Sequence, residues 1–134
     1  MRKLVLIVFM CLSFLGLSCQ SRQQFKSVDV EQFEKFISEK DVTLLDVRTA
    51  EEYSDGHIPG TDFNIDVLED SFTRIAVSKL PETKPVALYC RSGNRSKKAS
   101  QILSSKGYEV VELSTGFRGW VAAGKPVGKE SERH

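Results

Sequence analysis

This sequence is poor in cysteine, tryptophan and proline, and it has no excess of charge of either sign. Its 134 residues include three cysteines, one tryptophan and four prolines, and 19 basic residues balance 18 acidic ones. This balance gives no support to a nucleic-acid partner or to a strongly acidic or basic binding surface. The chain also lacks internal repeats and low-complexity segments. Its length suits a single hydrophobic core, so we expect one domain rather than two.

The longest hydrophobic run lies at the N-terminus and is too short to span a bilayer comfortably. A basic start precedes fourteen mostly apolar residues that end at Leu17, which is the layout of an export signal. We therefore predict that residues 1–18 are a signal peptide of the lipoprotein type. The segment Leu15-Gly16-Leu17-Ser18-Cys19-Gln20 resembles a bacterial lipobox, with Gly16 where leucine is usual. This resemblance implies a lipid on Cys19, and the alternative is a soluble secreted protein or an uncleaved anchor.

Export would decide which cysteines remain as thiols. Cys11 would be removed with the signal, and Cys19 would carry the lipid, followed by a polar tether over residues 19–26. Cys90 is then the single free thiol of the mature protein, so no internal disulfide is expected. The protein is expected to be anchored to a membrane of the bacterial cell envelope, facing the periplasm. A single free thiol in an exported protein is exposed to oxidation, so its presence indicates a functional role rather than a packing role.

Cys90 lies where a predicted strand ends and a predicted helix begins. The apolar run Val86-Ala87-Leu88-Tyr89 indicates a buried strand, and apolar residues at helical spacing afterwards indicate a helix that stops near Gly107. Backbone N–H groups of such a loop, together with the helix dipole, favour a bound anion. A cysteine there is expected to react as a thiolate. A buried structural cysteine is the simpler interpretation, but four nearby cations weigh against it: Arg91, Arg95, Lys97 and Lys98.

Strands and helices alternate along the rest of the chain. This alternation predicts an α/β fold with a central parallel sheet flanked by helices, in which ligands bind at the carboxyl ends of the strands. Residues 129–134 are expected to form a charged tail. The remaining predicted elements are a helix from the N-cap Asp29 to Lys40, strands over 42–47, 63–65 and 108–113, helices over 49–56 and 68–80, and a short helix from Gly116.

Four motifs, in the same order and spacing, resemble single-domain members of the rhodanese family of sulfurtransferases, over residues 27–128. The resemblance implies the rhodanese-like three-layer fold. The motifs are Leu44-Leu45-Asp46-Val47-Arg48 with Glu51-Glu52-Tyr53, Gly56-His57-Ile58-Pro59-Gly60, Tyr89-Cys90-Arg91-Ser92-Gly93-Asn94-Arg95-Ser96, and Gly116-Phe117 with Trp120 and Ala122-Ala123-Gly124-Lys125-Pro126-Val127.

The resemblance also implies a reaction in two halves. The Cys90 thiolate takes the outer sulfur of a small anionic donor such as thiosulfate, forming a persulfide, and passes it to a thiophilic acceptor such as cyanide. No metal and no organic cofactor is implied. The residues expected to bind the donor and stabilise the sulfur are Arg91, Ser92, Gly93, Asn94 and Arg95.

Several residues of the other motifs are expected to be structural rather than catalytic. Asp46 and Arg48 are predicted to hold neighbouring loops through an ion pair with Glu51 or Glu52. His57 is expected to be a turn residue with its hydrogen bonds satisfied rather than a general base. Trp120 either walls the pocket or packs in the core.

Three other functions are alternatives to sulfur transfer between small molecules. Cysteine phosphatases place five residues between cysteine and arginine, whereas four separate Cys90 from Arg95, which suits a single sulfur atom better than a phosphate. A catalytically weak module that binds a partner is the second alternative. The third is a relay that hands sulfur to a protein thiol at the cell envelope. The physiological donor and acceptor and the oligomeric state are left open by the sequence.

Overall fold

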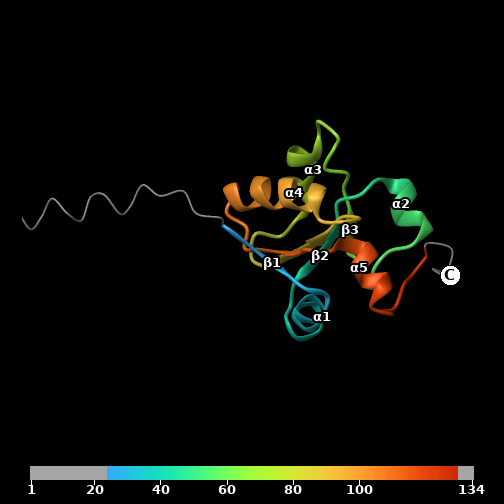
Figure 1. Cartoon of the computed structure of the whole chain (residues 1–134). Helices are drawn as coiled ribbons and strands as arrows, with labels where there is room; N and C mark the ends of the chain where they lie inside the picture. Colours follow the sequence, from blue (N-terminus) through green and yellow to red (C-terminus); the bar gives the residue numbers. More distant parts are fainter. Residues whose placement is uncertain (1–23, 130–134) are drawn as a thin grey trace, which may run out of the picture.

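The computed structural model describes residues 24–129, which form one α/β domain (Figure 1). The predicted signal peptide, the lipidation site Cys19 and the tail beyond Lys129 lie outside the described residues. The described elements are β1 Phe25–Val28, α1 Val30–Glu39, β2 Thr43–Asp46, α2 Ala50–Asp55, β3 Phe63–Asn64, α3 Phe72–Lys79, β4 Val86–Tyr89, α4 Asn94–Ser105, β5 Val110–Leu113 and α5 Gly116–Ala122.

The strands form one sheet in the order β1-β5-β4-β2-β3, and every pair is parallel. The central strands β2, β4 and β5 are buried along their whole length. Continuous burial is expected for a parallel sheet that is covered on both faces, and it accounts for the nearly unbroken apolar runs. The predicted fold class is therefore confirmed.

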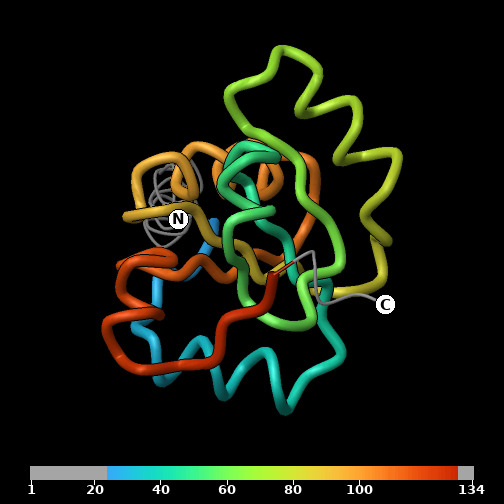
Figure 2. Tube along the Cα trace, turned by 90° about the vertical axis from the view of Figure 1, so that its right-hand side faces the viewer, coloured from blue at the N-terminus to red at the C-terminus, as the bar shows by residue number. Residues whose placement is uncertain are grey.

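Two hydrophobic cores lie on the two faces of the sheet. Helices α3 and α4 cover one face, where Phe72 and Leu103 are almost fully buried. Helices α1 and α5 cover the other, where Phe33 and Trp120 are buried. All five strands run in the same direction, so their carboxyl ends lie at the same end of the sheet. This end is turned toward the viewer in Figure 2. Side chains that follow β2, β4 and β5 therefore meet there.

Local capping signals set two helix starts. The Asp29 side chain accepts a hydrogen bond from the Gln32 N–H, and the Gln32 side chain returns to the Asp29 backbone. Thr49 and Glu52 form the same reciprocal pair at the start of α2. Each pair satisfies backbone N–H groups that a helix leaves without partners, so both helices begin where the sequence predicts.

Three predicted boundaries were wrong. The tether over residues 19–26 overlaps β1, because Phe25 and Lys26 pair with β5. The helix predicted over 68–80 begins only at Phe72, since the Asp66 carboxylate accepts from the Leu68 N–H and holds a turn. The strand predicted over 108–113 begins at Val110, because residues 107 and 108 complete the C-terminal cap of α4 through hydrogen bonds to Ser104 and Leu103.

Candidate active site

Cys90 is the first residue after β4, and its thiol lies beneath the loop that leads into α4. The residue is 1% exposed. Gly93 lets the loop turn back over the sulfur, because it has a φ of +104°, and a Cβ at this position would collide with the Ser114 carbonyl oxygen. The Gly93 N–H points at the sulfur, with 3.1 Å between N and Sγ. The loop therefore folds around one sulfur atom, as its sequence predicts.

Hydrogen bonds favour the ionised form of this thiol. Burial alone raises the pKa of Cys90, but the hydrogen bond between its thiol and the Ser96 side chain, and those from the backbone N–H groups of Ser96, Gly93 and Ser92, outweigh it. The net pKa of the thiol lies below its ordinary value. A thiol with a lowered pKa is a better source of nucleophilic thiolate at neutral pH.

The Arg95 side chain is held in an ion pair and is not free to bind an anionic sulfur donor. Its guanidinium forms a two-pronged ion pair with the Glu52 carboxylate, with N–O distances of 2.7 and 3.0 Å. The pair joins the first turn of α4 to α2. Arg95 therefore brings a largely neutralised charge to the site and helps to hold α2 in place, and its role in attracting an anion stays a prediction.

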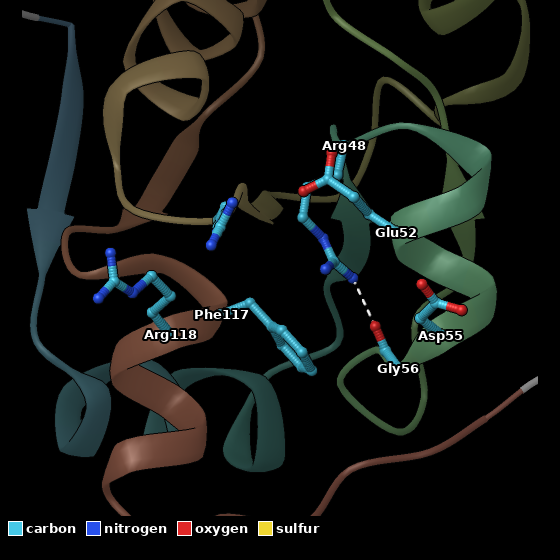
Figure 3. A pocket seen from close by; sticks show the side chains of 7 residues that line it. Arg48, Glu52, Asp55, Gly56, Phe117 and Arg118 are labelled. Atoms are coloured by element: carbon cyan, nitrogen blue, oxygen red, sulfur yellow. Dashed lines mark hydrogen bonds between the residues drawn. The ribbon is translucent and has the colours of Figure 1, made fainter.

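The ion pair predicted for Arg48 is also different. Arg48 binds Asp46 rather than Glu51 or Glu52, and both residues are buried at the end of β2. The same guanidinium donates to the Gly56 carbonyl at 2.7 Å, the contact drawn in Figure 3. It also lies over the Phe117 ring, 4.4 Å from its centroid. Arg48 thus ties β2, α2 and α5 together at one side of the site.

A pocket of about 290 Å³ opens beside the cysteine loop (Figure 3). Arg91, the residue after Cys90, forms part of its wall, and Arg118 of α5 lines it at the side away from Arg48 and Gly56 (Figure 3). Both arginines are exposed. Phe117 supplies an apolar surface. The remaining lining residues are Arg48, Glu52, Asp55 and Gly56.

The structure also gives the positions of the other residues considered in the sequence: Ser92, Asn94, His57 and Trp120. Ser92 and Asn94 are exposed, and the Ser92 backbone N–H donates to the Cys90 sulfur. His57 is buried, with its Nδ1 bonded to the Tyr53 carbonyl oxygen, as expected of a turn residue. Trp120 is buried and donates to the Pro126 carbonyl, and it does not line the pocket, so its role is in the core.

Sequence reasoning missed Arg118. A signal was available, because Arg118 lies just after β5, the strand beside β4 in a parallel sheet. The Phe117 and Arg118 N–H groups donate to the carbonyls of Cys90 and Arg91, at 2.8 and 3.0 Å, and so bind α5 directly to the cysteine loop. Gly116 permits this contact, since a Cβ there would collide with the Arg91 carbonyl.

Sequence reasoning also missed Glu112, a fully buried carboxylate on β5 that bonds to Ser96. An acidic residue inside an otherwise apolar strand was the signal.

Within residues 24–129, no group of three or more histidine, cysteine or acidic side chains is arranged to hold a metal ion. No helix in this part of the chain is long and apolar enough to cross a membrane.

Comparison with known proteins agrees with this geometry. The family model described as the rhodanese-like domain matches residues 29–123. A sulfurtransferase from Allochromatium vinosum is 34% identical over 104 residues, covering 75% of this chain and 92% of its own. A tRNA uridine(34) hydroxylase from Pelagibacter ubique is 34% identical over 105 residues, covering 77% of this chain. The chain spans only 35% of that hydroxylase.

Solved structures show the same fold. The crystal structure of a rhodanese-related protein from Thermoplasma volcanium aligns with a TM-score of 0.69 and 31% identity, covering 79% of this chain and 100% of that one. The solution structure of a rhodanese-like domain from Anabaena sp. aligns with a TM-score of 0.68 and 27% identity, covering 85% of both chains.

Proposed function

Since this chain belongs to the rhodanese-like domain family, we propose that it is a sulfurtransferase that carries sulfane sulfur as a persulfide on Cys90. The observation that carries the proposal is the position of the Cys90 sulfur under a loop whose Gly93 N–H points at it, at 3.1 Å. This arrangement stabilises a thiolate and, after transfer, a terminal persulfide anion. The sulfurtransferase name of the Allochromatium relative supports the same chemistry.

Thiosulfate, or an anion like it, is the proposed donor. Arg91 and Arg118 give the pocket two exposed cationic groups, and its volume accommodates a small oxyanion. The Cys90 thiolate attacks the outer sulfur of the donor, a new S–S bond forms at Cys90, and sulfite leaves with the electrons of the old S–S bond. The ionised nucleophile needs no separate general base at the moment of attack.

A thiophilic acceptor completes the cycle. Cyanide, for example, attacks the terminal sulfur of the persulfide, thiocyanate leaves, and the Cys90 thiolate is restored. A persulfide held on the enzyme between two substrates gives ping-pong kinetics. A protein thiol is an alternative acceptor for the same persulfide. We also propose that the protein works at the cell envelope, anchored through a lipid on Cys19.

Steady-state kinetics with thiosulfate and cyanide test the proposal. We expect thiocyanate formation with parallel double-reciprocal lines, and no activity above background in Cys90→Ser. The Cys19→Ser variant is the matched control, because it removes a cysteine outside the described domain and is expected to keep full activity in the detergent-solubilised protein. Intersecting lines, or activity that persists in Cys90→Ser, would exclude the persulfide mechanism. Absence of activity with protein whose thiol is shown to be reduced would favour a binding module.

A further inference from the structure

The proposed function leaves one buried ionisable group unused. Glu112 is fully buried in β5, and its carboxylate lies on the side of the sheet covered by α4. It accepts hydrogen bonds from three side chains on two other elements: Ser27 of β1, and Ser96 and Lys97 of α4. A buried carboxylate is costly unless it is paired and hydrogen-bonded, and these three contacts supply both.

Ser96 connects this carboxylate to the Cys90 sulfur. The Sγ of Cys90 lies 3.4 Å from the Ser96 Oγ, which lies 2.7 Å from the Glu112 Oε1. A hydroxyl has one proton to donate. While that proton is directed at Glu112, Ser96 accepts the proton of the Cys90 thiol rather than donating one. The resting hydrogen bonds therefore run from thiol to hydroxyl to carboxylate.

The direction has to reverse when the thiolate forms, because a thiolate has no proton to donate. We propose that Glu112 takes up the thiol proton through Ser96 and thereby acts as a positioning residue for the Cys90 nucleophile. The thiol proton moves to the Ser96 Oγ, the Ser96 proton moves to the Glu112 Oε1, and the electron pair of the S–H bond stays on sulfur. The protonated Glu112 then donates to Ser96, and Ser96 donates to the thiolate. This inference rests on the proposed role of Cys90.

The charged groups around Glu112 fit this cycle. The Nζ of Lys97 lies 3.2 Å from the Glu112 carboxylate, so a positive charge stands beside this carboxylate, and the Lys97 side chain is half exposed. From β1 only the neutral Ser27 hydroxyl reaches the carboxylate, and from the end of β4 the Cys90 thiol faces it through Ser96. The Ser96 hydroxyl is in hydrogen-bond contact with both the thiol and the carboxylate, so one connected path joins the two groups.

If Cys90 and Glu112 share one proton, the rate of Cys90 alkylation should depend on pH in a characteristic way. Between the two titration steps of the pair, a constant small fraction of molecules holds the proton on Glu112 and a thiolate on Cys90. The rate of Cys90 alkylation by iodoacetamide should therefore rise in two steps with a plateau between them. The tryptic peptide that ends at Arg91 contains Cys90 alone among the cysteines, so its mass reports alkylation at this site in the full chain.

The Glu112→Gln variant separates a shared proton from a structural role. We expect a single step in its profile, a rate that falls about tenfold per pH unit below the midpoint, and a midpoint about one pH unit lower than the upper step of the native protein, because the negative charge is gone. Glu109→Gln, an exposed change just before β5, is the matched control and should keep both steps.

Ser96→Ala keeps the inference testable if Glu112→Gln does not fold. It removes the donor that the thiolate needs after reversal, so the midpoint should rise and the plateau should fall. A single step in the native protein, or a Glu112→Gln profile that superimposes on it, would overturn the inference. Alkylation needs no sulfur donor, so this result stands whether or not thiosulfate is turned over, and failure of the proposed function is recognised separately.

Discussion

The ion pair between Glu52 and Arg95 predicts a pH-dependent contribution to stability. The hydrogen bonds that the Glu52 carboxylate accepts from Arg95 outweigh burial and, together with the one from the Thr49 N–H, lower the pKa of Glu52 from an ordinary 4.5 to about 2. A carboxyl with a depressed native pKa stabilises the fold above the unfolded pKa. That contribution is lost as the pH falls from about 4.5 through about 2.

The size of the effect follows from the exposure of the pair. The full shift corresponds to about 3 kcal/mol as an upper limit. The Glu52 and Arg95 side chains keep 27% and 22% of their surface exposed, so solvent screening reduces the expected contribution to about 1–2 kcal/mol. Glu52→Gln removes the charge but retains the side-chain oxygen that accepts from Thr49 in the capping box.

Urea unfolding followed by circular dichroism measures the change. We expect Glu52→Gln to lower the free energy of unfolding by about 1–2 kcal/mol at pH 7, and the difference from the native protein to shrink steadily between pH 4.5 and pH 2. Glu51→Gln, an exposed change in the same helical turn, is the control for the helix dipole and should alter stability by less than about 0.5 kcal/mol. An equal deficit for Glu52→Gln at pH 7 and at pH 2 would refute the reasoning.

Three further predictions follow from the site. Gly93→Ala should destabilise the protein by at least about 1–3 kcal/mol in thermal unfolding, because of its positive φ and the Ser114 carbonyl, and an unchanged Tm would contradict this. Asp46→Asn should cost about 3–5 kcal/mol in urea unfolding, since it leaves the buried Arg48 without its charge partner, and a loss under 1 kcal/mol would argue against that role. Arg118→Gln should raise KM for thiosulfate about three- to tenfold at unchanged kcat, whereas a fall in kcat alone would place Arg118 elsewhere in the mechanism.

Local signals accounted for much of the fold. The capping boxes at Asp29 and Thr49 involve residues three positions apart, so their starts are readable from the sequence. The first strand was missed because it is a four-residue edge strand with two exposed residues, and only its pairing with β5 distinguishes it from a polar tether. Edge strands carry little periodicity of their own, and tertiary pairing decides them.

The residues of the site also differ in whether local sequence or tertiary pairing determines their contacts. The loop around Cys90 was predictable because strand, cysteine, glycine and helix follow one another directly in the chain. The partner of Arg95 lies 43 positions away, and the partner of Ser96 lies 16 positions away. These pairings depend on which strands lie side by side, and the order β1-β5-β4-β2-β3 is not contained in any local pattern.

The most direct test is the mass of the Cys90 peptide before and after the reduced protein is treated with thiosulfate and alkylated. Sulfur transfer to Cys90 predicts a gain of one sulfur atom on the tryptic peptide that ends at Arg91. The gain should be reversed by cyanide and absent in Cys90→Ser. No gain on this peptide, with its thiol shown to be reduced beforehand, would contradict the assignment of Cys90 as a sulfur carrier for thiosulfate.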